Sequence, residues 1–180
     1  MMQELPLSRV AGLLGSAPVV MLATSSGGRA NVMAMAWLTM VEFEPPLLAC
    51  VVGSDHLSFA SLRASRECVI AVPPAGLADR LVAVGSVSGR EVPDKFAAFG
   101  LTHLPATEVA APLVDGCIAN LECRIRDDSL AGSLNLFVLE VVKAWIDPAQ
   151  KGAKTLHHLG EARFFTEGET VTARPPAPRT

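Results

Sequence analysis

The pattern of apolar and polar residues predicts a chain built mainly of short strands. Segment 119–127 alternates apolar Leu121, Cys123 and Ile125 with polar residues, so we expect a strand there with one side facing solvent. The sequence SSGG at 25–28 predicts a tight turn, and hence a hairpin of the runs that flank it. Apolar, β-branched runs between turn residues predict strands at 19–24, 31–36, 41–44, 47–52 and 68–72.

The C-terminal third adds a longer apolar run at 134–146. A helix is one interpretation of this run, but Val138, Val141 and Val142 favour a long strand. Segments 163–166 and 169–173 lie on either side of Gly168 and predict a hairpin that closes the fold.

Helical spacing of apolar residues, together with start and stop residues, predicts a few short helices between the strands. Ser54 and Asp55 are expected to cap the helix that runs to Arg66. Pro93 and Gly100 bracket another helix in the order that helices prefer. The expected helices are 9–15, 54–66, 77–84 and 93–99.

Many short antiparallel strands with a few interposed helices predict an α+β fold, mainly antiparallel β, arranged as a barrel or sandwich. The chain shows no repeat and no internal linker. We therefore expect a single domain over 1–173, followed by an unstructured Pro-rich tail at 174–180.

Composition narrows the possible partners. The 180 residues carry 18 acidic and 15 basic side chains, a net charge of −3, with no run of Lys or Arg. Seven Phe, two Trp and no Tyr are too few and too scattered for a base-stacking groove, which argues against nucleic acid. The densest apolar stretch, 31–41, is too short to span a bilayer, and the N-terminus lacks a signal-peptide layout. We expect a cytoplasmic protein that binds neither nucleic acid nor membrane.

No side-chain pattern predicts a metal site or a catalytic residue. The four cysteines form no CxxC pair, and Cys50 and Cys68 lie in apolar runs, which indicates reduced structural thiols. The adjacent His157 and His158 would point to opposite sides of a strand, so they are poorly placed to share one ion. No Gly-x-Ser-x-Gly nucleophile motif is present. A cofactor with its own reactivity is the simplest source of chemistry.

Three polar segments interrupt the apolar chain and are candidates for binding a ligand. In the first, at 31–39, Asn31 and Thr39 offer hydrogen bonds, and Ala34 and Ala36 leave room for a flat group. The alternative is a buried strand with polar ends.

The second segment, 53–58, is a strand-to-helix turn that predicts a phosphate site at Ser54, His56 and Ser58. An ordinary helix cap is the alternative. In the third segment, 85–90, glycines flank serines, and Arg90 and the nearby Lys95 supply positive charge. It is neither a Walker loop nor a GxGxxG motif, and a plain surface loop is its alternative interpretation.

The stretch NVMAMAWLTMVEFEPP at 31–46 resembles the signature of the flavin reductase-like, FMN-binding split-barrel proteins. The resemblance continues in order through GSDHLSFASL, VSGREVPDKFAAFGL, APLVDGCIANLECRI and NLFVLEVVKAW, and covers about 18–173. It implies an FMN-binding split barrel with a few interposed helices. It also implies a homodimer of six-stranded barrels with one FMN at each end of the subunit interface.

By position, the resemblance also implies which residues hold the flavin. One group lies beside the isoalloxazine and ribityl chain, a second forms the phosphate turn, a third forms a second ligand loop, and one aromatic residue closes over the ring. These groups are Asn31, Ala36, Trp37 and Thr39; Ser54, His56 and Ser58; Ser88, Gly89, Arg90 and Lys95; and Phe164. Arg90 stands where the charged residue of the loop varies within the family. Leu134 and Leu139 stand where many relatives carry His and Gly, a departure on the substrate side.

The leading functional hypothesis is an NAD(P)H-dependent flavin reductase, in which hydride passes from nicotinamide C4 to flavin N5. No side chain need act as acid or base, because the protein contributes stacking and alignment. The alternatives are a flavoredoxin-like FMN electron carrier with a protein partner, an oxidase of the pyridoxamine-phosphate type, and a barrel that serves only in assembly. A monooxygenase is a further possible partner of a reductase.

Overall fold

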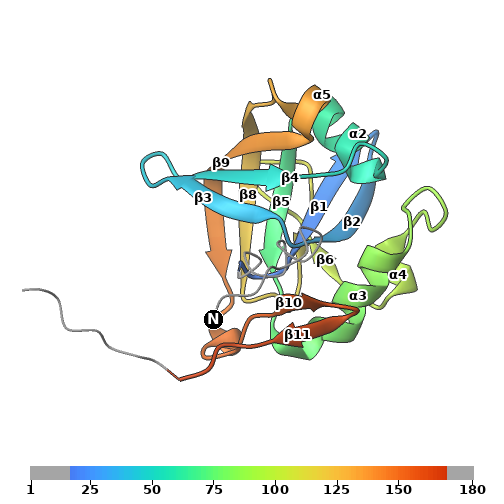
Figure 1. Ribbon diagram of the computed structural model, residues 1–180. Helices are drawn as coiled ribbons and strands as arrows, with labels where there is room; N and C mark the ends of the chain where they lie inside the picture. The colour runs from blue at the N-terminus through green and yellow to red at the C-terminus, as the bar shows by residue number, and fades with distance from the viewer. Residues whose placement is uncertain (1–16, 170–180) are drawn as a thin grey trace, which may run out of the picture.

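A computed structural model of the chain describes residues 17–169, in which one curled antiparallel sheet forms most of the fold (Figure 1). The strand order is β2-β1-β5-β8-β9-β4-β3, so β2 and β3 are the two edges. These edges follow one another in the chain with two residues, 36–37, between them, which requires the sheet to curl until its edges approach. The strands are β1 Val20–Ser26, β2 Arg29–Met35, β3 Leu38–Glu42, β4 Leu47–Val51, β5 Glu67–Val72, β8 Ala119–Asp127 and β9 Leu136–Ile146.

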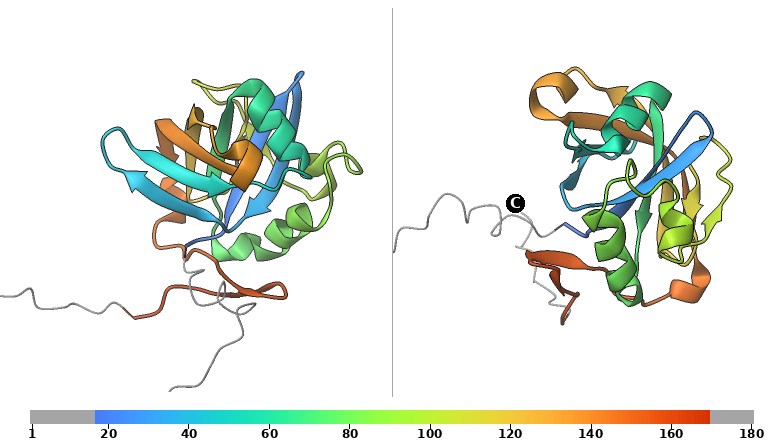
Figure 2. Two further views of the ribbon diagram at one scale, coloured as in Figure 1. Left: turned by 45° about the horizontal axis from the view of Figure 1, so that its top comes forward. Right: turned by 90° about the vertical axis from the view of Figure 1, so that its right-hand side faces the viewer.

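Short helices and two small hairpins surround the curled sheet. Helices α2 and α5 lie at one end of it, whereas α3, α4 and the hairpin of β10 and β11 lie toward the other (Figures 1 and 2). The helices are α2 Leu57–Ser65, α3 Ala78–Ser86, α4 Lys95–Ala98 and α5 Ala131–Leu134, with 3-10 turns at Ala75–Leu77 and Pro148–Gln150. The two-stranded sheets pair β6 His103–Leu104 with β7 Leu113–Val114, and β10 His157–Gly160 with β11 Arg163–Phe165.

Alternation along β1 divides the core into two layers. Met21 and Ala23 pack into one apolar cluster, with Leu81 of α3 and Phe96 of α4. The neighbouring Val20 and Leu22 pack into a second cluster, which includes side chains of α2, β4 and β9. Successive side chains of a strand point to opposite faces, so one strand serves both layers. In the first of these layers, helix α3 packs against β2.

Most predicted elements are confirmed. The first hairpin, the strands at 47–52 and 68–72, the alternating strand at 119–127 and the long strand within 134–146 are all present. The expected strand at 41–44 begins earlier, at Leu38. The helices near 54–66 and 93–99 are also present with shorter bounds, and the helix near 77–84 is present at 78–86. The fold class, mainly antiparallel β with few helices, is confirmed.

Several details are wrong. His56 caps α2 without a side-chain hydrogen bond, in place of the expected Ser54 and Asp55. The sheet has seven strands, not the six that the resemblance implies. A hairpin that the sequence did not predict turns at 161–162, where β11 pairs with the preceding segment β10.

The prediction that one side of β8 faces solvent is also wrong for the first half of the strand. Asn120 and Glu122 are buried, because the loop before β8 covers that side. The Asn120 amide pairs with Val114, accepting from its N–H at 2.8 Å and donating to its carbonyl at 3.1 Å. The polar residues of this strand therefore anchor a loop instead of facing water.

Some predictions fall outside the described residues. These are the helix at 9–15, residues 170–173 of the closing hairpin and the tail at 174–180. The single domain over 1–173 stays a prediction. Among residues 17–169, no helix is long and apolar enough to cross a membrane.

All four cysteines are buried and free of disulfides. Burial, aided by the neighbouring Cys123, raises the pKa of the Cys50 thiol to about 12. Burial, with a contribution from Asp115, raises the pKa of Cys117 to about 12 as well. Cys68 lies directly opposite Cys123 across the β5–β8 pair. Within the described range, no group of three or more potential metal ligands comes together.

Candidate functional site

A polar pocket of about 240 Å³ lies where β2, the start of α2 and the loop after α3 meet. Its lining includes six of the residues that the resemblance assigns to the flavin: Asn31, His56, Ser58, Ser88, Gly89 and Lys95. We call it the polar pocket. All three polar segments of the sequence thus contribute to a single site.

The back of the polar pocket is a close contact among its three segments. Buried Asn31 donates from Nδ2 to Oγ of buried Ser58 at 2.8 Å, which links β2 to α2. A Cβ at position 89 would stand 2.2 Å from Oδ1 of Asn31 and 2.8 Å from Cδ2 of Leu57. Only glycine allows the loop to approach this closely. The loop backbone is therefore held against the strand and the helix start.

Two arginines fasten the loop after α3. Arg29 of β2 donates to the carbonyl of Gly89, and its Nε donates to the carbonyl of Pro93 at 3.2 Å. Arg90 donates from its guanidinium to the carbonyl of Asp55 in the turn before α2. Arg90, which was expected to contact the ligand, lies outside the pocket lining and instead joins the loop to that turn.

Lys95 places a buried cation in the wall of the polar pocket. Its side chain is 3% exposed, and Nζ donates to the carbonyl of Val84 at 2.8 Å. Burial lowers the pKa of Lys95, because a charged amine loses water there. An ammonium carries three N–H donors, so this one retains donors for a further acceptor. The lining also includes the exposed carboxylate of Asp55, so the donors for an anion are the Lys95 ammonium and the hydroxyls of Ser58 and Ser88.

A second pocket, of about 310 Å³, adjoins the polar pocket, and Gly85 and Ser86 line both. We call it the apolar pocket. It includes two residues that the resemblance places beside the flavin ring, Ala36 and Phe164. Its other lining residues are Val19, Ala34, Met35, Leu81, Val82, His158 and Ala162. An anion site thus continues into a compartment suited to a flat apolar group.

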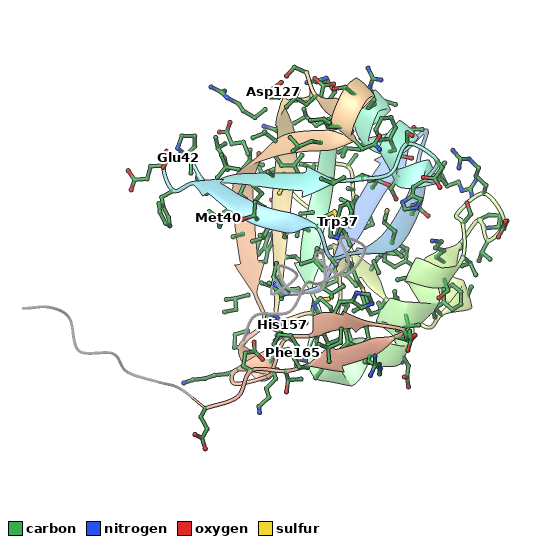
Figure 3. All side chains as sticks on the ribbon, in the orientation of Figure 1. Trp37, Met40, Glu42, Asp127, His157 and Phe165 are labelled. Atoms are coloured by element: carbon green, nitrogen blue, oxygen red, sulfur yellow. The ribbon has the colours of Figure 1, made fainter. Side chains whose placement is uncertain are left out.

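Besides Arg90, three expected site residues lie outside both pockets. Ser54 is exposed in the turn before α2. Trp37, which is 65% exposed, directly precedes the edge strand β3, and Thr39 lies at the start of that strand; Figure 3 labels Trp37 and, further along β3, Met40. Within one copy of the chain, the structure does not bring these residues to the pockets.

Sequence reasoning also missed residues that the structure places in the site. Arg29 and His158 are the main ones, since one braces the loop and the other lines the apolar pocket. Both depend on contacts between segments far apart in the chain, which no local motif reveals. Gly85 carried a local signal, as the first glycine of the third polar segment.

Comparisons with known proteins show what this chain is similar to. The family model of the flavin reductase like domain matches residues 15–166. YddH of Escherichia coli strain K12 is 33% identical over 93% of this chain and 95% of its own length. An NADH-dependent FAD reductase of Streptomyces globisporus is 29% identical over 74% of this chain and 72% of its own.

A solved structure shares the fold as well. The FMN-binding domain of a flavin reductase-like enzyme from Shewanella baltica matches with a TM-score of 0.82 and 28% identity. The match covers 94% of this chain and 96% of the Shewanella chain. The likeness therefore extends over nearly the whole length of both proteins.

Proposed function

Since the chain belongs to the flavin reductase-like domain family of FMN-binding split-barrel proteins, we propose that it binds FMN and transfers hydride from NAD(P)H to flavin. The observation that carries this proposal is the pair of adjoining pockets that share Gly85 and Ser86. FMN has an anionic phosphate at one end and a flat ring at the other, and the two pockets have the matching chemistry.

In this proposal the polar pocket holds the phosphate. Lys95 supplies a buried positive charge, and Ser58, Ser88 and His56 line the same space. Backbone N–H groups at the start of α2 add donors, since the first N–H groups of a helix lack partners within it. Asn31 holds Ser58 in place. The donor set fits a phosphate monoester.

The apolar pocket holds the ring, beside Ala36 and Phe164. Bound flavin would supply the hydride acceptor, and no side chain has to move a proton. The protein's part is to bind, to align and to limit water beside the ring. The similarity to an NADH-dependent FAD reductase supports a nicotinamide as the hydride donor.

The first test is direct binding. We expect purified protein to bind FMN with a changed flavin absorption spectrum, and a Lys95→Met variant to bind FMN about tenfold to a hundredfold more weakly. Riboflavin, which lacks the phosphate, should bind both proteins equally. If Lys95→Met weakened the binding of FMN and of riboflavin equally, the result would contradict a phosphate contact. A folded wild-type protein that bound neither ligand would overturn the proposed function.

The second test concerns the reaction. Anaerobic mixing of the FMN-loaded protein with NADH or NADPH should bleach the flavin absorption with at least one of them. Flavin that stays oxidised with both would contradict the reductase proposal.

A flavoredoxin-like carrier is the second candidate, and the substitution at Leu134 favours it. The family resemblance implies a His at this position in many relatives, whereas Leu134 is 59% exposed on α5 and carries no group that could hydrogen-bond a nicotinamide. A carrier would keep FMN through gel filtration and would exchange electrons with a protein partner while remaining inert to NADH and NADPH.

We also propose that two copies associate through β3. Met40 of this edge strand and the flanking Trp37 and Phe43 are exposed, the last 82% exposed. Unpaired edge strands with exposed apolar side chains pair with other chains. Trp37 and Thr39, which lie outside the pockets of their own chain, would then reach flavin held together with the partner subunit. A reductase of this kind can supply a monooxygenase, which makes such an enzyme a further candidate partner.

A further inference from the structure

The apolar pocket is lined by one polar side chain, His158, that makes no hydrogen bond within the described part of the chain. The other polar side chain of the lining, Ser86, already donates to the carbonyl of Val82 at 2.7 Å. The imidazole of His158 contacts the ring of Phe164, with centroids 5.6 Å apart and planes tilted by 52°. Among residues 17–169, no hydrogen bond or ion pair is formed by this imidazole.

The hairpin that carries His158 fixes its position. His158 and Phe164 are opposite each other in the β10–β11 pair, and the turn between the strands consists of Glu161 and Ala162, both at positive φ. Two positive φ values are typical of the two-residue turns that match strand twist. Leu156, just before the hairpin, accepts a hydrogen bond from the N–H of Val19 at 2.7 Å. The imidazole is thus presented to the pocket by a braced element.

The rest of the lining favours a flat, uncharged group. Ala34, Ala36 and Gly85 contribute the small surfaces, and a Cβ at Gly85 would stand 2.9 Å from Cβ of Ala34. No Asp, Glu, Lys or Arg belongs to the lining. A charge placed there would lose water without gaining a partner, whereas a carbonyl oxygen would gain the imidazole donor.

We propose that His158 is a ring-binding residue, whose imidazole N–H donates a hydrogen bond to a carbonyl oxygen of the isoalloxazine. This inference rests on the proposed function, in which the apolar pocket holds the flavin ring. A donor at a carbonyl of the ring favours the reduced flavin, because reduction adds electron density to the ring. His158 therefore affects both ring affinity and reduction potential.

The test uses riboflavin to isolate the ring from the phosphate. We expect His158→Phe to bind riboflavin and FMN more weakly by the same factor, about tenfold, which is the usual worth of one hydrogen bond. Lys95→Met provides the contrast, since it should weaken FMN alone. His158→Gln keeps an N–H donor and should recover part of the affinity. His103→Phe, the same change on β6, outside the lining of both pockets, is the matched control.

Reduction potential supplies the second readout. With FMN saturating, His158→Phe should lower the midpoint potential by about 30 mV, the equivalent of a further tenfold loss of affinity for the reduced flavin. Unchanged riboflavin affinity and potential in His158→Phe, with normal FMN binding by the wild type, would overturn this inference and leave the proposed function standing. Failure of the wild type to bind FMN would overturn both. A loss confined to FMN would assign His158 to the phosphate and overturn its role at the ring.

Discussion

At the scale of single residues, Glu122 shows how a buried charge can be held. Its side chain on β8 is fully buried. It accepts from Nε1 of Trp145 at 2.7 Å and from the backbone N–H groups of Thr107, Glu108 and Val109 at 3.1, 2.6 and 3.1 Å. Burial raises the pKa of this carboxyl, but the hydrogen bonds, led by that of Trp145, outweigh burial, so the net pKa is lowered.

Replacing this carboxylate should destabilise the protein in a pH-dependent way. Glu122→Gln keeps the size but turns an N–H₂ group toward N–H donors, so we expect a loss of about 3 kcal/mol in the free energy of unfolding at neutral pH. Because the folded pKa lies below the ordinary value of 4.5, the wild-type advantage is complete above that value and disappears as pH falls through the folded pKa.

Urea denaturation of both proteins at a series of pH values measures this difference. The exposed Glu91, changed to Gln, is the control and should unfold like the wild type. A difference between Glu122→Gln and the wild type that stays constant from pH 7 to strongly acid conditions would contradict the assignment.

At the scale of elements, α3 contacts β2 at Gly85, which lines both pockets. Gly85→Ala should push α3 away from Ala34, since the added Cβ would lie 2.9 Å from Cβ of that residue. We expect a loss of about 1–2 kcal/mol in stability together with weaker FMN binding. Gly76→Ala is the matched change, because an added Cβ there meets nothing within 4 Å. Denaturant titration and flavin titration of both variants test this, and equal behaviour would contradict it.

The strand β8 illustrates how far sequence reasoning extends. Its alternation predicted the element and its bounds, because backbone periodicity is local. The assignment of solvent to the side of Asn120 and Glu122 was wrong, because the N–H groups that bind Glu122 come from a loop more than ten residues earlier. The turn at Glu161 and Ala162 was missed for a related reason: glycine was the turn signal used, and neither residue is glycine.

The same difference between local and long-range signals holds for the residues of the candidate site. Ser58, Ser88 and Gly89 were found because they interrupt an apolar chain with polar or small residues. His158 was missed because its place in the apolar pocket depends on how the C-terminal hairpin docks near α3, which is a long-range contact. Figure 3 shows the neighbouring His157 beside Phe165 on this hairpin, and their rings stack with centroids 4.8 Å apart.

At the scale of the whole molecule, the exposed edge β3 should decide the oligomeric state. We expect the wild type to show twice the 18.9 kDa mass of the chain by gel filtration with light scattering. Phe43→Asp should shift the protein to the single-chain mass, because a charge would be buried in the interface. Ile146→Asp, a change at a 76% exposed residue of β9, is the control. A wild type at the single-chain mass would overturn the dimer.

Because the four cysteines are buried, chemical labelling of their thiols can report the local unfolding of the chain. Thiolate is the reactive form, and the pKa of about 12 at Cys50 and at Cys117 leaves almost none of it at neutral pH. A maleimide dye added to the folded protein should therefore remain unattached until the sheet separates. Labelling rates would then follow fluctuations of the barrel without any engineered probe.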